Sequence, residues 1–250
     1  MLTLILAVIL GWIGSLIVNY LSDVLPSMRK VTKPGCAECQ ADLPFDFYLL
    51  HRPCGECGRG PSLRHWIVYI LGPVLAGLIH YFPSPNLGIW GGILWLVFFG
   101  LLVVIDLEHR LILHPVSITG AGLGLVFGIL SHGFLATVVG GAAGFGIMLI
   151  FYLMGNLFIK ILSRTRGEEI DEVALGFGDV NLAGVIGLLL GWPGVIAGVF
   201  LAILLGGIIS AAVLFVQLFR KKYQAFQALP YGPFLVVSVL FLLYFSHTLN

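Results

Sequence analysis

The chain has 250 residues, of which 59% are hydrophobic and only 10% are charged, and its net charge is +1 at pH 7. An ordinary soluble domain carries about 25% charged residues, so this composition excludes that class. The mean hydropathy of +1.04 predicts an integral membrane protein in contact with the lipid bilayer, and the near-zero net charge indicates no nucleic-acid partner.

Eight apolar stretches are predicted to be transmembrane helices, because a spanning helix needs about 20 mainly apolar residues. In chain order they are 2–21, 66–82, 88–105, 113–130, 135–160, 180–191, 194–219 and 232–247. The first lacks the basic region and cleavage site of a signal peptide, so we expect it to be retained. The sixth is short and merges with the seventh. We therefore expect an all-α polytopic integral membrane protein with about eight transmembrane helices.

Charged residues indicate how these helices are oriented. All 13 Lys and Arg and all 12 Asp and Glu lie in or next to the connections that follow the odd-numbered helices. The opposite connections carry no charged residue. Because short basic loops stay in the cytoplasm, we expect a multi-pass protein with its N-terminus outside.

The first connection contains all four cysteines, in two Cys-x-x-Cys pairs. The cysteines are Cys36, Cys39, Cys54 and Cys57, with 14 residues between the pairs. This spacing is at or just below the short end of the roughly 15–20 residues typical of a four-cysteine zinc ribbon, and four thiolates would complete a structural zinc site. A redox dithiol and two disulfides are the alternatives, but stable disulfides are unusual in the cytoplasm. We divide the chain into a first helix at 1–21, a cytoplasmic metal-binding loop at 22–65 and a membrane domain at 66–250.

Two aspartates differ from the other acids, which lie in polar loops. Asp106 ends one apolar run and Asp179 begins another, both at the predicted cytoplasmic boundary of a span. An ionisable group at such a position is a functional candidate, although an N-cap would also explain Asp179. Gly176 and Gly178 precede Asp179, and we expect them to let the backbone bend and approach a peptide closely.

The two aspartates together suggest an acid–base pair. Two close carboxylates share a proton, so one can activate water while the other polarises a peptide carbonyl. We hypothesise that Asp179, at a helix N-terminus, is the base and that Asp106, at a C-terminus, is the acid. Because such a pair titrates as a unit, the two roles are interchangeable at this stage.

With these residues in view, the sequence resembles the type IV prepilin peptidases, membrane aspartic proteases of the GxGD type. Four segments and both cysteine pairs carry the resemblance. The segments are GSLIVNYL at 14–21, VIDLEHRLI at 104–112, GFGD at 176–179 and LPYGPFL at 229–235.

The resemblance implies a function for the whole chain. It implies an endopeptidase of the bacterial inner membrane, with Asp106 and Asp179 as catalytic residues facing the cytoplasm. Its substrates would be prepilins or pseudopilins of a type IV pilus or type II secretion system, each with a short basic leader before an apolar helix. Many members also methylate the new N-terminus with S-adenosylmethionine. The irregular segment containing Pro230, Gly232 and Pro233 is then expected to line the active site; a helix-start turn is the alternative.

Several positions depart from the family pattern. Asn181 stands where the family usually has Lys, and Pro115 comes later after the first aspartate than usual. The spacer between the cysteine pairs is shorter than in many bifunctional members, and Tyr69 occupies a position where Glu is common. The last two lie in the region associated with methylation, so that activity stays open.

Other functions remain as alternatives to the peptidase. An ion-coupled transporter with a zinc-stabilised cytoplasmic loop would also contain membrane acids, but it is expected to place them near the bilayer midplane. No acid lies in the middle of a predicted span. A methyltransferase without protease activity would not need both aspartates.

Overall fold

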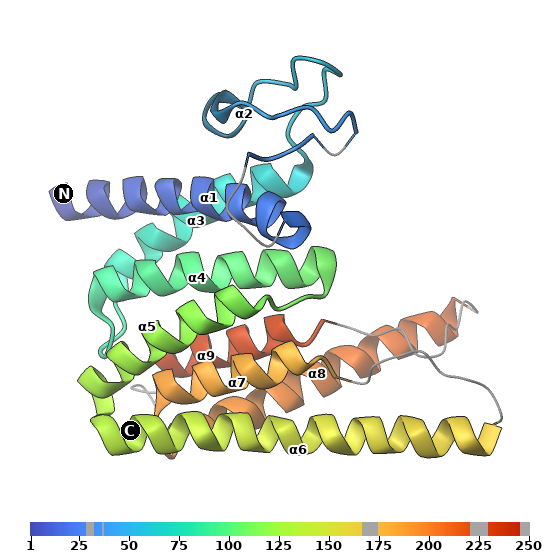
Figure 1. Ribbon diagram of the computed structural model, residues 1–250. Helices are drawn as coiled ribbons and strands as arrows, with labels where there is room; N and C mark the ends of the chain where they lie inside the picture. Colours follow the sequence, from blue (N-terminus) through green and yellow to red (C-terminus); the bar gives the residue numbers. More distant parts are fainter. Residues whose placement is uncertain (29–32, 37, 167–174, 221–229, 246–250) are drawn as a thin grey trace. The chain divides into compact units, whose positions relative to one another are not determined.

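The computed structural model describes residues 1–28, 33–36, 38–166, 175–220 and 230–245, and these fold almost entirely as helices (Figure 1). The helices are α1 (Leu2–Met28), α2 (Phe45–Leu50), α3 (Leu63–Tyr81), α4 (Gly88–His109), α5 (His114–His132), α6 (Phe134–Arg166), α7 (Phe177–Leu190), α8 (Gly194–Phe219) and α9 (Gly232–Phe245). Contacts divide the chain into two compact units, Met1–His109 and Arg110–Asn250. We call them unit 1 and unit 2 and describe each by itself.

The predicted all-α membrane fold is confirmed. Six helices (α1, α3, α4, α5, α6 and α8) are long and apolar enough to cross a membrane, and α7 and α9 are shorter apolar helices of 14 residues each. At 1.5 Å per residue a 14-residue helix is about 21 Å long, less than the ~30 Å of a bilayer core. Every predicted apolar stretch is thus helical, and the sixth is short as expected. The three-part division of the chain stays a prediction.

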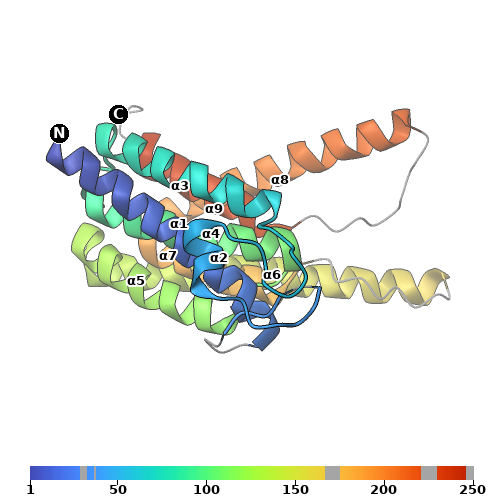
Figure 2. The ribbon, with the colours of Figure 1, turned by 90° about the horizontal axis from the view of Figure 1, so that it is seen from above.

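In unit 1, α1 packs lengthwise on α3 and α4 through small and polar side chains (Figure 2). The buried hydroxyl of Ser15 donates to the carbonyl of Val68 at 2.9 Å, and the amide of Asn19 donates to the carbonyl of His65 at 3.3 Å. A Cβ at Gly72 would overlap the Ser15 hydroxyl. The GSLIVNYL segment therefore joins two helices by hydrogen bonds that lipid could not replace.

In unit 2, α7 is the central helix, with contacts to α5, α6, α8 and α9 (Figure 1). Its backbone approaches that of α6 very closely, because a Cβ at Gly187 would overlap the carbonyl oxygen of Gly140. One turn along, a Cβ at Gly144 would overlap the carbonyl oxygen of Ala183. Small residues four apart on both helices permit this approach, as in other membrane helix pairs. The packing fixes α7, which carries Asp179, within unit 2.

Candidate active site and cysteine cluster

Asp179 lies in the first turn of α7. The helix begins at Phe177 after Gly176 at the N-cap position, so the Asp179 side chain is not itself the N-cap. Its Oδ2 atom accepts a hydrogen bond from the Gly176 amide at 3.3 Å, and the residue is only 8% exposed. The positive end of a helix dipole favours a negative charge at this position. Local structure therefore stabilises a carboxylate in an otherwise apolar unit.

The two glycines of the GFGD segment are needed for space rather than for unusual backbone angles. Gly176 has φ of −73°, which any residue can adopt. A Cβ at Gly178 would lie 2.6 Å from the Cβ of Ile112, in the segment between α4 and α5. A Cβ at Gly176 would lie 3.3 Å from Oδ2 of Asp179. Gly176 thus has an ordinary backbone conformation, and close packing explains Gly178. The expected approach of a peptide to the two glycines stays a prediction.

The segment before α9 places a tyrosine near Asp179. The helix begins at Gly232, and the carbonyl of Tyr231 accepts the amide of Phe234 at 3.1 Å. Burial raises the pKa of Tyr231 to about 12, and the charge of Asp179 adds to this effect. Among the described residues, its buried hydroxyl has no hydrogen-bond partner. The sequence had pointed to Pro230, Gly232 and Pro233 and had missed the tyrosine between them.

Asp106 lies within α4, one turn before the helix ends at His109. It is 4% exposed and belongs to the buried side of this helix in unit 1. Since Asp179 belongs to unit 2, each aspartate is described within its own unit. Their pairing therefore stays a prediction. Both are buried carboxylates at a helix end, which is the setting in which catalytic acids are found.

Near Asp106, Arg64 joins three helices of unit 1. Its guanidinium pairs with Asp23 of α1 and, through Nε, with the carboxylate of Glu108 of α4 at 3.2 Å. It also donates to the Ser22 hydroxyl. Arg64 opens α3 directly after the cysteine loop, so it ties that loop to the end of α4 that carries Asp106.

Asp23 also binds the cysteine loop directly. The Tyr48 hydroxyl donates to Oδ2 of Asp23 at 2.7 Å, and Nε2 of His65 lies 3.2 Å from the same atom. Burial, together with the Asp23 charge, raises the pKa of Tyr48 well above its usual range. Tyr48 therefore remains a proton donor to this carboxylate. Sequence reasoning missed this network because its members are far apart in the chain.

We expect Arg64→Gln to destabilise the protein, because Asp23 and Glu108 would keep partly buried charges without their shared cation. Breaking a fully buried pair costs about 3–5 kcal/mol; the partial exposure here reduces this to about 1–3 kcal/mol. Thermal unfolding in detergent should show a melting temperature lowered by about 2–4 °C per kcal/mol. Arg52→Gln is the control, since its pair with Asp46 is exposed and it should change little. Equal shifts for both variants would contradict the prediction.

The two Cys-x-x-Cys pairs form two turns with the same hydrogen bonds. In each, the amide of the first cysteine donates to the carbonyl five residues later at 2.8 Å. Four residues after Cys36 and after Cys54 the backbone is left-handed, at Gln40 (φ 59°) and Gly58 (φ 72°). Glycine adopts this conformation without strain, which explains the Gly in the second turn.

The four sulfur atoms converge. The Sγ atoms of Cys36 and Cys57 are 3.5 Å apart, those of Cys39 and Cys54 are 3.6 Å apart, and all four lie within 4.8 Å of one another. Thiolates bound at 2.3 Å in a tetrahedron would be about 3.8 Å apart. These distances are too long for disulfide bonds and match a site that could hold a metal ion.

Backbone amides within each turn favour the thiolate form. Hydrogen bonding from the backbone amide of Cys39 is the main cause that lowers the pKa of Cys36 to about 6. The amide of Cys57 likewise lowers the pKa of Cys54. Because a metal binds the thiolate, these amides prepare the first cysteine of each pair as a ligand.

The sequence of this chain matches a known family over the region that holds both aspartates. The model of the type IV leader peptidase family matches residues 93–211. The chain is similar to this family over just under half of its length. This similarity supports a peptidase, and the match runs from α4, with Asp106, through α7, with Asp179, into α8.

Curated relatives extend the similarity beyond this region. The prepilin leader peptidase/N-methyltransferase of Pectobacterium carotovorum subsp. carotovorum is 29% identical over 220 residues, covering 83% of this chain and 72% of that protein. The protein of the same name from Aeromonas hydrophila is 25% identical over 226 residues, covering 86% and 72%. That of Neisseria gonorrhoeae is 27% identical over 213 residues, covering 81% and 68%. No solved structure matches the chain.

Proposed function

We propose that this chain is an aspartic endopeptidase that removes the short basic leader from type IV prepilins or pseudopilins. The observation that carries the proposal is the pair of buried aspartates, Asp106 and Asp179, inside the region matched by the leader peptidase family. The names of the curated relatives support a prepilin substrate. Both carboxylates lie at the ends of apolar helices. At such a position the substrate's basic leader would meet the start of its apolar helix, at the surface of the membrane.

The proposed chemistry divides between the two carboxyl groups. Asp179, at a helix N-terminus, takes a proton from water, and the water oxygen attacks the scissile carbonyl carbon. Asp106 gives its proton to the carbonyl oxygen, so the tetrahedral intermediate forms without a free oxyanion. Collapse breaks the C–N bond, and the leaving amine takes a proton from Asp179, while Asp106 regains its own. Pro230, Gly232 and Pro233 border the substrate site in this proposal, with Tyr231 beside Asp179.

The proposed location is the bacterial inner membrane, in several passes, with the N-terminus outside and both aspartates facing the cytoplasm. The six apolar helices support a multi-pass protein. The clustering of all Lys and Arg at alternate connections supports the orientation. The basic leader of the substrate would then meet the enzyme on the side where the leader is synthesised.

We also propose that the cysteine cluster holds a structural zinc ion and that S-adenosylmethionine binds unit 1. Four thiolates leave no open coordination position, so the zinc would stabilise the loop rather than activate water. The residues of one groove in unit 1, of about 410 Å³, suit a nucleoside: the half-buried Tyr20 offers aromatic surface and Asp42 a carboxylate for hydroxyl groups. When bound, S-adenosylmethionine would supply the methyl group for the new N-terminus.

Co-expression with a candidate prepilin tests the peptidase function. We expect the pilin to lose its leader only in cells that contain this chain, and mass measurement should place the new N-terminus directly after the leader. A further increase by one CH2 unit would show methylation. The proposal would be refuted if the enzyme is correctly inserted and every pilin and pseudopilin precursor of the host nevertheless keeps its leader.

A further inference from the structure

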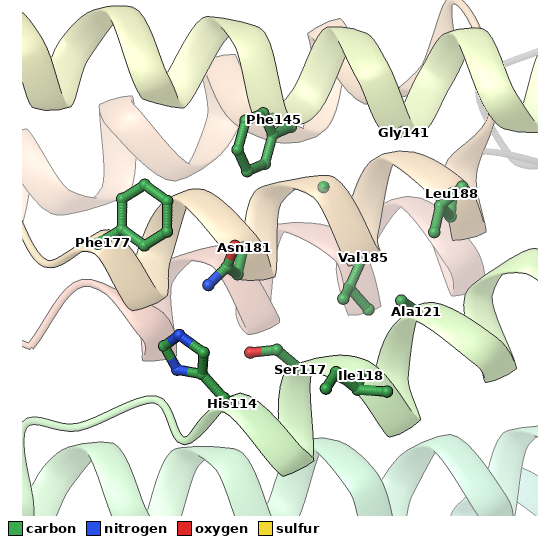
Figure 3. A pocket seen from close by; sticks show the side chains of 11 residues that line it. His114, Ser117, Ile118, Ala121, Gly141, Phe145, Phe177, Asn181, Val185 and Leu188 are labelled. Carbon is green, nitrogen blue, oxygen red and sulfur yellow. The ribbon is translucent and has the colours of Figure 1, made fainter.

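A second pocket lies in unit 2, between α5, α6 and α7 (Figure 3). Its volume is about 370 Å³, within the usual range for small-ligand sites. At one end are three polar residues, His114, Ser117 and Asn181, and the remaining wall is apolar. Figure 3 shows the Ser117 hydroxyl and the Asn181 amide directed toward the end that holds the His114 ring.

This pocket is separate from the catalytic carboxylate of the same helix. The residues of α7 that line it are Phe177, Asn181, Gly184, Val185 and Leu188, which share one face of the helix. Asn181 lies two residues after Asp179, which places it about 200° around the helix axis. A ligand in the pocket would therefore contact the back of α7 and leave the Asp179 face open.

The polar end of the pocket requires a partner. Ser117 is only 9% exposed, and its hydroxyl has no hydrogen-bond partner in the described part of the chain. Several other hydroxyls in this unit bond to a backbone carbonyl three or four residues earlier, as Thr119 does to the carbonyl of Pro115 at 2.9 Å. An unpaired hydroxyl is costly in an apolar region. A carbonyl oxygen placed between Ser117 and Asn181 would satisfy both donors.

The surroundings indicate what brings that carbonyl. The helices α5 and α6 meet at Gly133 and move apart toward the end of α5 that carries His114 (Figure 1). Ile118, at the edge of the pocket, is 72% exposed on a helix long and apolar enough to cross a membrane. A gap with such an edge opens toward the bilayer, where acyl chains are the available apolar material.

We propose that this pocket binds one acyl chain of a membrane phospholipid. The chain fills the apolar part between Gly141, Val185 and Leu188, and its ester carbonyl accepts hydrogen bonds from Ser117 and Asn181. His114 lies at the headgroup end. Asn181 thus has a role as a neutral donor to an ester. The site does not depend on the proposed peptidase function, and neither does its test.

The test uses full-length protein in nanodiscs that contain a phospholipid with a photoreactive diazirine in its acyl chain. After irradiation, mass spectrometry of peptides should locate the label on the residues that line the pocket. Ala121→Phe fills the pocket from α5 and should remove most of this label. Gly122→Phe is the matched control, because the space around Gly122 is open and the residue lies outside the pocket lining. It should leave the label unchanged.

A second variant separates a bound lipid from an empty pocket, and it does not require the fold to accept a larger side chain. Loss of one neutral hydrogen bond corresponds to about a threefold to tenfold weaker binding, so Ser117→Ala should reduce the pocket label by this factor. It should also reduce the rise in melting temperature on adding phospholipid to delipidated protein. Thr119→Val, which removes a hydroxyl already bonded within its helix, should do neither.

Three results would overturn the proposal. If neither Ala121→Phe nor Ser117→Ala changes the labelling, the label reports only general contact with lipid. No label on the pocket residues of the wild type, together with a more stable Ser117→Ala protein, would show an empty pocket with an unpaired hydroxyl. Cross-links from the pocket to a second copy of the chain, or to a bound pilin helix, would assign the site to a protein partner. Because no readout is cleavage, these results are distinct from failure of the peptidase function.

Discussion

Asp179→Asn should abolish leader removal while leaving the protein folded. Asparagine has nearly the same shape as aspartate and can accept the Gly176 amide, but it cannot take a proton from water. General acid–base groups contribute about 10²–10⁴-fold to rate, so kcat/KM should fall by at least that factor. Asp106→Asn should have an equally large effect, because the two groups are proposed to share one proton. Rates of prepilin cleavage by purified enzyme give the measurement.

The control must separate chemistry from folding. Asp46→Asn makes the same replacement at an exposed aspartate of the cysteine loop and should keep full activity. Melting temperature and metal content should match the wild type in all three variants. An active Asp106→Asn enzyme would remove this residue from the catalytic pair, even if Asp179 proved essential. An inactive but unfolded variant would be replaced by Asp→Glu at the same position, which keeps the carboxyl group.

The proposed roles also predict how cleavage depends on pH. A pair in which one group must be ionised and the other protonated gives a bell-shaped profile of kcat/KM. Its two limbs belong to Asp106 and Asp179 together. A Tyr231→Phe variant should keep this profile's shape, since Tyr231, with its pKa raised to about 12, stays protonated throughout.

Sequence reasoning was most successful where the signal is local. Hydropathy predicted every apolar helix, because a spanning segment must satisfy its own backbone and is apolar throughout. The spacing of the Cys-x-x-Cys pairs predicted a four-sulfur cluster, and the structure brings all four sulfur atoms together. Helix ends were less well predicted: α1 continues to Met28 and α6 to Arg166, both beyond the apolar stretches. The last turns of these helices contain polar residues, and a hydropathy criterion does not include such residues in a predicted span.

The features that sequence reasoning missed depend on residues far apart in the chain. Arg64 comes near Asp23 and Glu108 only when α1, α3 and α4 pack together. Gly140 and Gly187 face each other across two helices, so neither alone indicates the close approach. A glycine in a membrane helix predicts that another helix packs closely there, but the sequence does not indicate which helix that is.

Cys54→Ser should remove the metal and unfold the cysteine loop. Among the described residues of this segment, Cys36 and Cys54 form a small buried cluster with Leu43, Phe47 and Tyr48. In small zinc modules the metal contributes about 10–16 kcal/mol to folding, so loss of one thiolate is expected to be severe. Metal analysis should fall from one ion per chain to well below one. Chelation of wild-type protein should have the same effect.

Limited proteolysis gives an independent measure of the loop. Arg59, which is followed by Gly60, is a trypsin site within it, and we expect the chain to be cut there far faster in Cys54→Ser than in the wild type. Glu56→Gln is the matched control, because it alters the same turn without removing a sulfur ligand, and it should keep both the metal and the resistance to trypsin.

A wild-type protein that purifies with well under one metal ion per chain would exclude the structural site. If the wild type contains metal and Cys54→Ser keeps both the metal and the resistance to trypsin, then Cys54 is not a ligand. If the loop unfolds, the Tyr48–Asp23 hydrogen bond is lost with it, and the effect should extend to α1 as a lower melting temperature of unit 1.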